Sequence, residues 1–185
     1  MTDSILEDGG VSLRPLVEDD VPLLARWFFD PDVLQWLQIS EDPPHLRTME
    51  AIRERFEIMR DDPFTEVWRI DADGRPIGQI ELVGIHELQR RAEVHLSIGE
   101  KDVWGRGHGT RAVHLVLQHA FEDLPLRRVF AMADADNARV IRLFEKCGFA
   151  REGLLHEHRL RHGRPVDMVV MGLLGREYVA PNSRV

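Results

Sequence analysis

Three glycines alternate with other residues between an extended segment and a helical one. They are Gly105, Gly107 and Gly109, with Arg106 and His108 between them. Glycine has no Cβ and tolerates positive φ, so the backbone of such a loop can come close to a ligand. The N-terminus of a helix adds roughly half a positive charge and unpaired N–H groups. The pattern therefore predicts a phosphate or pyrophosphate site, the alternative being a flexible turn.

Two common nucleotide-binding motifs fit this loop poorly. A P-loop requires Gly-Lys and then Ser or Thr after a four-residue gap, and this sequence is missing here. A dinucleotide-binding loop is followed about twenty residues later by an acidic residue that binds the ribose. Here that position is Val129. The anion site is therefore expected to be of another type.

Two blocks of the sequence resemble the GNAT superfamily of acyl-CoA-dependent N-acyltransferases. Residues 104–110 match the glycines of its pyrophosphate loop, although Trp104 stands where Arg or Gln is common. Residues 137–149 are similar to its helix of the form Asn-x-x-x-x-x-Leu-Tyr-Glu-Lys-x-Gly-Phe. Further matches at residues 13–16 and 152–174 extend the resemblance over nearly the whole chain.

The resemblance implies an acetyltransferase that binds acetyl-CoA as a cosubstrate and uses no metal. In the family, the strand before the glycine loop grips the pantetheine arm, and a backbone N–H of that strand binds the oxyanion. The loop, the helix after it and the helix of the second block complete the cofactor site. The implied cofactor-binding residues are Leu96, Ser97, Ile98, Trp104, Gly105, Arg106, Gly107, His108, Gly109, Thr110, Asn137 and Phe144.

An amine acceptor must lose a proton before it attacks a thioester. At pH 7 only about one alkyl amine in 2,500 is neutral. In the family a carboxylate or a chain of waters near the pantetheine strand takes this proton. Glu93 is therefore the first candidate base, His95 the second and Glu81 on the neighbouring strand the third. Strand alternation places Glu93, His95 and Ser97 on one face of the sheet. The alternative interpretation of each candidate base is an ordinary side chain of the sheet that faces solvent.

Phe144 stands where the family often has a tyrosine that protonates the departing thiolate. Phenylalanine cannot donate a proton. A thiol of pKa about 8.5 is a tolerable leaving group, so we expect the thiolate to leave unaided or with help from water or another side chain. This substitution also leaves open a protein of another class, a non-catalytic acyl-CoA-binding sensor.

The elements that must position these residues form a mixed α/β pattern. We expect strands at residues 11–16, 67–71, 76–83, 92–98, 128–133, 149–158 and 166–173, with helices after residues 18–22, after Asp30, after Thr48, after the glycine loop and at residues 137–147. This order matches the GNAT topology. The expected fold is a central mixed sheet of about seven strands, splayed in the middle, with helices on both faces.

Length and composition indicate a single domain. The 185 residues are 43% hydrophobic, and no linker divides them, so we expect one acyl-CoA N-acyltransferase domain over residues 1–185 with a flexible segment at 1–10. No apolar run is long enough for a membrane span, and the N-terminus is acidic where a signal peptide would be basic. The lone Cys147 is expected to be a packing residue. A cytoplasmic monomer or homodimer without membrane partners is predicted.

The net charge of the chain indicates which kinds of partner it favours. With 24 Lys and Arg against 32 Asp and Glu, the net charge is −8, which disfavours nucleic acid and favours a cationic partner. His156 and His158 share a strand face, but no second ligand pair completes a metal site. No metal is therefore expected.

The acceptor is the least determined part of the prediction. We expect direct transfer of acetyl to a primary amine, either a protein N-terminus or a small-molecule amine, in a ternary complex. Residues 13–16 and 163–167 resemble the ribosomal-protein N-terminal alanine acetyltransferases, whereas residues 24–27 and 32–36 are similar to aminoglycoside N-acetyltransferases. An aminoglycoside or a polyamine is the alternative acceptor. The resemblance implies that the helices after the first strand form one wall of the acceptor site.

Overall fold

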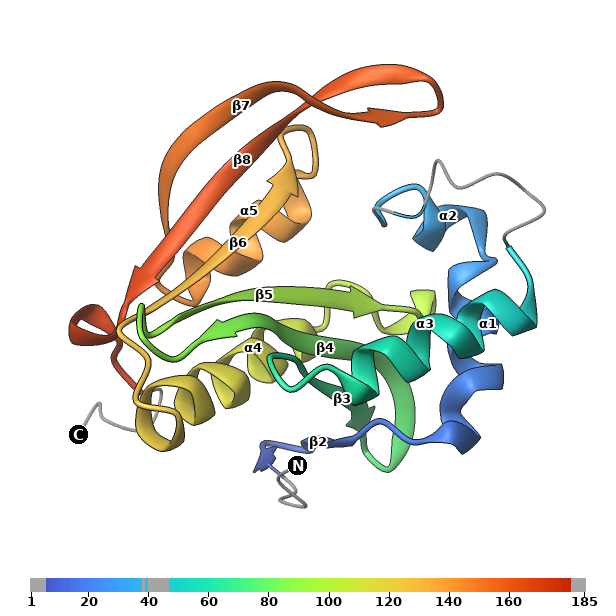
Figure 1. The fold of residues 1–185 in the computed structure, drawn as a ribbon, viewed down its shortest axis with the longest axis horizontal. Helices are drawn as coiled ribbons and strands as arrows, with labels where there is room; N and C mark the ends of the chain where they lie inside the picture. The colour runs from blue at the N-terminus through green and yellow to red at the C-terminus, as the bar shows by residue number, and fades with distance from the viewer. Residues whose placement is uncertain (1–5, 38, 40–46, 181–185) are drawn as a thin grey trace.

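A computed structural model describes residues 6–37, 39 and 47–180 of the chain, built around one mixed sheet (Figure 1). The sheet has eight strands in the order β1-β2-β3-β4-β5-β6-β8-β7. It confirms the predicted GNAT-like mixed α/β fold, with one strand more than expected. The additional strand is β1, at residues 6–8 of the segment predicted to be flexible, where Leu6 packs against the core.

The strands are β1 (Leu6–Asp8), β2 (Val11–Pro15), β3 (Glu66–Ala72), β4 (Arg75–His86), β5 (Arg91–Ile98), β6 (Arg128–Asp134), β7 (Ala150–Arg161) and β8 (Arg164–Leu174). The helices are α1 (Val21–Phe28), α2 (Pro31–Leu34), α3 (Met49–Asp61), α4 (His108–Gln118) and α5 (Ala138–Lys146). A π-helical turn, His119–Asp123, continues α4, and 3-10 turns lie at Glu18–Asp20, Lys101–Val103 and Gly175–Glu177. No described helix is both long and apolar enough to cross a membrane.

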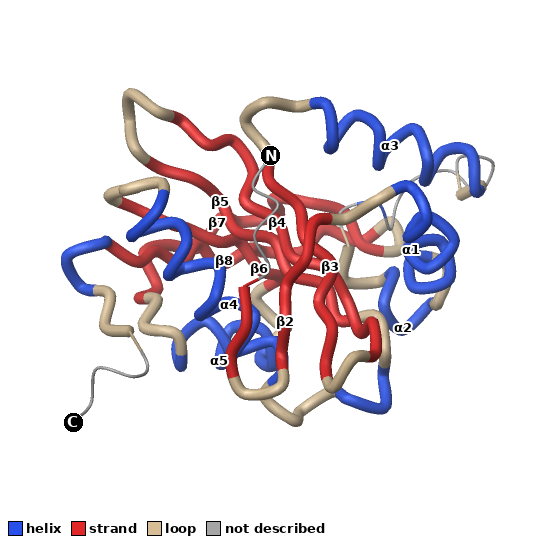
Figure 2. Tube along the Cα trace, turned by 90° about the horizontal axis from the view of Figure 1, so that it is seen from below, coloured by secondary structure: helices blue, strands red, loops and turns tan. Residues whose placement is uncertain are grey.

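Helices cover both faces of the sheet, and each face has its own apolar core. Figure 2 shows α3 on one side of the sheet and α4 and α5 on the other. Alternation along β3 assigns the cores to the faces, since Trp68 belongs to the core shared with α4 and α5, whereas Val67 packs against the core of α1 and α3. On β5, Val94 faces the α4 side. Its neighbours Glu93 and His95 therefore face the α1 and α3 side.

The middle of the sheet is splayed, as predicted. β5 and β6 are the only parallel neighbours among the described strands, and their pairing ends at Glu93 and Phe130. Beyond that point the strands diverge, while β5 remains paired with β4 as far as Ile98 and β6 with β8 as far as Asp134 (Figure 1). In the described structure no strand pairs with the β6-facing edge of residues 94–98. Backbone peptide groups on that edge can therefore bind a ligand.

Two helices begin directly after Asp30 and Thr48, as predicted, and each of these residues caps its helix. Oγ1 of Thr48 accepts a hydrogen bond of 3.1 Å from the N–H of Ala51, and Oδ1 of Asp30 accepts one of 2.9 Å from the N–H of Asp32. A side-chain oxygen at this position satisfies an N–H group that the first turn leaves unpaired. These caps fix the starts of α3 and α2, the helices expected to border the acceptor.

Candidate functional site

Two different structural features explain why glycine stands at three positions of the loop before α4. Gly105 has φ +80° and Gly107 has φ +88°, a region that L side chains rarely adopt. Gly109 has no positive φ, but a Cβ on it would lie 2.9 Å from Cδ1 of Leu143 and 3.3 Å from Cδ2 of Leu96. Conformation thus requires the first two glycines, whereas close packing of α4 against α5 and β5 requires the third.

The start of α4 offers a group of N–H donors. Gly107 is the N-cap, and its carbonyl accepts the N–H of Arg111 at 3.1 Å. The N–H groups of His108, Gly109 and Thr110 come before this bond, so the helix supplies no acceptor for them. The helix dipole is positive at the same end. The glycine loop and this first turn therefore fit a diphosphate.

Trp104 joins the loop to the end of β5. Its Nε1 donates a hydrogen bond of 2.8 Å to the carbonyl of Ile98, and the guanidinium of Arg139 lies 4.8 Å from the centre of its ring. Arg139 belongs to α5, whose N-cap Asn137 accepts the N–H of Val140 at 3.2 Å. The cofactor-binding residues predicted on β5, on the loop and at the start of α5 are thus brought together.

Phe144 lies in the core. The residue is 2% exposed and the centre of its ring lies 5.0 Å from that of Phe149, so its predicted contact with pantetheine remains a prediction. The one tyrosine of the chain, Tyr178, packs on Phe121 in the π-helical turn at the far end of α4. Burial raises the pKa of Tyr178 to about 12. A tyrosine acid is therefore not available beside the glycine loop.

The three candidate bases form one cluster on the α1 and α3 side of the sheet. Nε2 of His95 lies 3.2 Å from Oε1 of Glu93, and its Nδ1 lies 3.6 Å from Oε2 of Glu81. The strand register explains the meeting, since Glu81 on β4 stands opposite His95 on β5. Sequence reasoning missed a fourth member, Gln79, whose Nε2 donates a bond of 2.5 Å to Oε1 of Glu81. Its position two residues before Glu81 on a strand was the available signal.

The charge of His95 follows from this arrangement. Burial alone would lower the pKa of the imidazole, but the carboxylates of Glu81 and Glu93 together raise it to about 9. His95 is therefore an imidazolium at neutral pH and has no lone pair with which to accept a proton. The carboxylates are the groups in this cluster that can act as a base near pH 7, and the choice between them remains a prediction.

Several buried polar atoms of the cluster have no hydrogen-bond partner among the described residues. They are Oε1 of Gln79, Oε1 of Glu93 and Nε2 of His95, the last two lying at ion-pair distance without hydrogen-bond alignment. Buried polar atoms are normally satisfied by protein, water or a ligand. Two of these atoms, Oε1 of Gln79 and Oε1 of Glu93, are hydrogen-bond acceptors in a cluster that contains two carboxylates. The cluster therefore suits an ammonium group or water molecules.

Cys147 is a packing residue, as expected. It is buried, its Sγ lies 3.7 Å from the carbonyl of Thr110, and burial raises the pKa of the thiol to about 12. Because the thiolate is the nucleophilic form, this cysteine is unreactive at neutral pH. A covalent acetyl-cysteine is therefore not part of the chemistry of this site.

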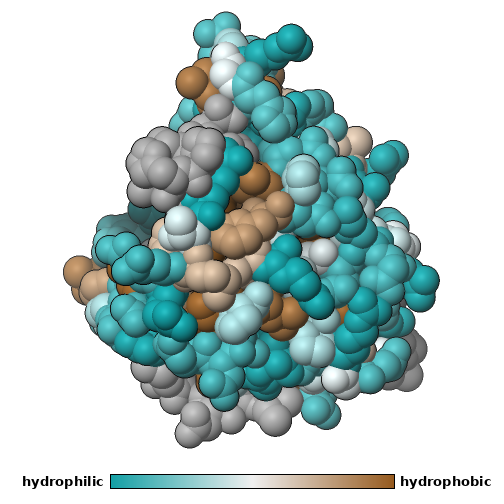
Figure 3. Space-filling model, turned by 90° about the vertical axis from the view of Figure 1, so that its right-hand side faces the viewer, coloured by the Kyte–Doolittle hydropathy of each residue, from teal (hydrophilic) through white to brown (hydrophobic). Residues whose placement is uncertain are grey.

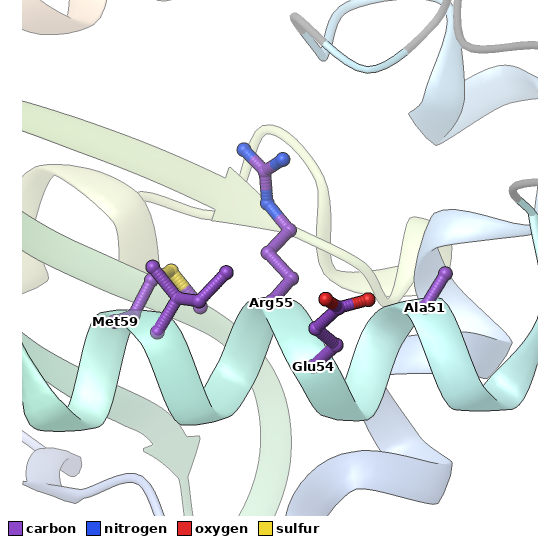
Figure 4. Close-up of a pocket in the computed structure, with 5 residues that line it drawn as sticks. Ala51, Glu54, Arg55 and Met59 are labelled. Carbon is purple, nitrogen blue, oxygen red and sulfur yellow. The ribbon is translucent and has the colours of Figure 1, made fainter.

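Two hollows open on the side of the molecule formed by α1, α2 and α3, where apolar side chains gather at the centre of a hydrophilic face (Figure 3). One, of about 350 Å³, lies along α3, where Glu54 and Arg55 project beside Met59 (Figure 4). The other, of about 290 Å³, lies between α2 and His162 at the tip of the β7–β8 hairpin. Neither is lined by a predicted catalytic or cofactor-binding residue.

Metal-ligating side chains do not gather anywhere in the described part of the chain. No group of three or more His, Cys, Asp or Glu residues there is arranged to hold a metal ion. Of the pair singled out in the sequence, Nδ1 of His156 lies 3.2 Å from Oδ2 of Asp167. This histidine therefore has a structural partner within the hairpin.

Known proteins resemble this chain over most of its length. Residues 11–150 match the acetyltransferase (GNAT) domain family. The chain is 27% identical over 174 residues to spermidine N(1)-acetyltransferase of Escherichia coli K12, covering 94% of this chain and 90% of that protein. It is 27% identical over 179 residues to the uncharacterized N-acetyltransferase p20 of Bacillus licheniformis, with coverage of 91% and 94%. The crystal structure of spermidine N-acetyltransferase from Vibrio cholerae in complex with CoA and spermine has a TM-score of 0.82 at 24% identity and covers 92% of this chain and 99% of that one.

Proposed function

Because this chain belongs to the GNAT acetyltransferase family, we propose that it transfers the acetyl group of acetyl-CoA to a primary amine of a polyamine. Membership of this family supports the enzyme class, an acetyltransferase, and the cosubstrate, acetyl-CoA. The polyamine rests on the spermidine acetyltransferases among its relatives, and it replaces the protein N-terminus as the favoured acceptor. A ribosomal-protein acceptor has no comparable support.

The buried acidic cluster is the observation that carries this proposal. Glu81 and Glu93 flank one imidazolium, His95, so the three side chains together carry a net negative charge. Oε1 of Gln79 adds a buried acceptor without a partner in the described structure. A cationic amine is the ligand that such a group attracts, and the net charge of −8 favours its approach over longer distances.

The chemistry follows from this cluster and from the splayed strand. A carboxylate, Glu93 or Glu81, takes a proton from the ammonium group, directly or through water. The neutral amine then attacks the thioester carbonyl, the N–C bond forms and the C–S bond breaks. A backbone N–H on the free edge of residues 94–98 donates to the oxyanion. As the tetrahedral intermediate collapses, its nitrogen loses a second proton, which passes through water to the departing thiolate, since Phe144 has none to give.

Acetyl-CoA fits the residues that the structure brings together. The first turn of α4 and the loop glycines bind the diphosphate, and the free edge of β5 binds the pantetheine arm, whose amides need backbone partners. Since Cys147 is buried and un-ionised at neutral pH, the acetyl group has no cysteine carrier. This agrees with the proposed direct transfer in a ternary complex.

An acceptor screen tests the proposal. CoA release is followed at pH 7.5 with spermidine, spermine, an aminoglycoside and a peptide that begins with alanine. We expect kcat/KM for the polyamines to exceed that for the peptide by at least about tenfold, because only a polycation gains from the acidic cluster. The variant Gly107→Val, in which the diphosphate site is disturbed, serves as the inactive control. A higher kcat/KM for the peptide would overturn the polyamine assignment.

A further inference from the structure

The hairpin of β7 and β8 reaches across the splay and binds the segment that ends α2. Nη1 of Arg159 donates a hydrogen bond of 2.8 Å to the carbonyl of Leu37, and Nη2 donates one of 3.0 Å to the carbonyl of Gln35. Nη2 also lies 2.8 Å from Oδ2 of Asp134, at the end of β6. One guanidinium therefore joins α2 to the far half of the sheet. Figure 1 shows the hairpin tip and α2 on the side toward which β5 and β6 diverge.

This connection is largely shielded from water. The side chains of Arg159 and Asp134 are 12% and 4% exposed, and Arg161 adds a second ion pair of 2.9 Å to the same carboxylate. The guanidinium of Arg161 also lies 4.9 Å from the ring centre of Trp36, in the segment that Arg159 holds. Removing one partner from a buried group of this kind leaves a charge uncompensated. Loss of this connection therefore costs more stability than loss of a surface ion pair.

A bulge in β7 sets the direction in which Arg159 points. Leu155 faces Met168 on β8, but the next pair along is Arg159 and Val166. Three residues of β7 thus stand opposite a single residue of β8, Asp167. A bulge of this type bends the strand and redirects the side chains that follow it. Arg159 is the first paired residue after the bulge.

Asp167 holds this bulge together. Glu157, at its centre, has φ +49°, a conformation that is costly for a residue with a side chain. Oδ1 of Asp167 accepts the N–H of Glu157 at 2.8 Å, and Oδ2 lies 3.2 Å from Nδ1 of His156. The N–H of Glu157, and then His156, lower the pKa of Asp167. The carboxylate of Asp167 therefore stabilises the strained backbone at Glu157 by accepting its N–H.

We propose that Asp167 is a positioning residue for the amine acceptor: it holds the bulge that aims Arg159 at the carbonyls of Gln35 and Leu37 after α2, and so fixes one wall of the acceptor site. This inference rests on the proposed function, in which α2 borders the acceptor. Asp167 itself touches neither substrate in this scheme. Its effect passes through Arg159, and the cofactor site at the glycine loop lies outside that path.

Steady-state kinetics of substituted enzymes test the inference. We expect Asp167→Ala to raise the KM for the polyamine by about tenfold, with the KM for acetyl-CoA and kcat changed by less than about twofold. Asp167→Asn keeps an oxygen for the N–H of Glu157 and should recover most of the loss. Arg164→Ala removes an exposed arginine from the same hairpin and should change neither KM. A purely structural role would instead affect both substrates and kcat together.

A double variant tests whether the two residues act through one contact. Arg159→Ala should raise the polyamine KM by itself, and adding Asp167→Ala should then have little further effect, because residues that share a contact are not additive. Additive effects of the two substitutions would overturn the inference.

A measurement without any acceptor separates this inference from the proposed function. Amide hydrogen exchange of residues 31–37 should be at least about tenfold faster in Asp167→Ala and in Arg159→Ala, while exchange in β5 is unchanged. Faster exchange in an enzyme that acetylates no polyamine would support the positioning role and overturn the proposed acceptor. Unchanged exchange of residues 31–37 in Asp167→Ala would overturn the positioning role whatever the acceptor is.

Discussion

His95 and Glu93 stand two residues apart on β5, and Nε2 of the imidazole lies 3.2 Å from Oε1 of the carboxylate. On its other side the ring approaches Glu81, with Nδ1 at 3.6 Å from Oε2. Two carboxylates in one buried site repel each other, and the positive ring between them offsets that repulsion. The histidine is therefore better described as the partner of two candidate bases than as a base itself near neutral pH.

The first prediction concerns Glu93 as the base. Glu93→Gln should leave the affinity for acetyl-CoA unchanged but lower kcat/KM at pH 7 by about a hundredfold, since the ammonium group would lose its proton acceptor. Part of the loss should return at high pH, where the amine deprotonates itself. The pH–rate profile and calorimetric titration with acetyl-CoA check both statements. Glu81→Gln is the matched variant, and a larger loss there, with an unchanged profile for Glu93→Gln, would move the role to Glu81.

The second prediction concerns the charge of His95. Its pKa of about 9 in the folded protein lies above the ordinary histidine pKa of 6.5, so protonation of His95 stabilises the fold fully below pH 6.5. That contribution is lost as the pH rises through 9. The difference in Tm between the wild type and His95→Gln should therefore be largest near pH 6 and smaller at pH 9.5. A Tm difference that stays constant over this range would show that His95 is not held as an imidazolium.

The third prediction separates the reasons for the loop glycines. Gly107→Val and Gly109→Val should each weaken acetyl-CoA binding by more than about tenfold in calorimetry. Gly109→Val should also lower Tm, because its Cβ alone would lie 2.9 Å from Cδ1 of Leu143 and its methyl groups would crowd Leu143 and Leu96 further. Gly84→Val is the control, since Gly84 has φ +60° and open space around its Cβ site but lies on β4, away from the loop. Near-normal affinity in both loop valine variants would rule out this loop as the diphosphate site.

Local patterns in the sequence were sufficient for the strand, glycine loop and helix at residues 91–118 and for much of the fold. The alternation along β5 and the three glycines lie within one short segment, and the positive φ of Gly105 and Gly107 is a requirement of the local backbone. Thr48 and Asp30 marked helix starts for the same reason. The packing of Gly109 against Leu143, by contrast, joins two distant parts of the chain. The splay between Glu93 and Phe130 came from the family resemblance, because no local pattern records where two strands part.

Other features depend on contacts between distant residues and were not predictable. Arg159 binds the carbonyl of Leu37 across 122 positions of sequence, and nothing near either residue indicates the pairing. The bulge at Glu157 is equally hidden, since its positive φ falls on a residue other than glycine and is supported from the opposite strand. The meeting of Glu81 with His95 depends on the register of β4 against β5, which the sequence did not define.

The last prediction concerns the position that holds Phe144. Phe144→Tyr would place a hydroxyl group in a site that is 2% exposed and packed against Phe149, so we expect a loss of about 1–3 kcal/mol in the free energy of unfolding. We expect no increase in kcat, because the buried hydroxyl would not reach the departing thiolate. Phe144→Leu should lower stability through lost packing while keeping the high-pH limb of the rate profile, since no ionisation at this position contributes to it. Denaturant unfolding and pH–rate profiles of both variants provide the measurements. A kcat that rises in Phe144→Tyr would mean that the ring does border the pantetheine arm and that the enzyme is limited by the lack of an acid there.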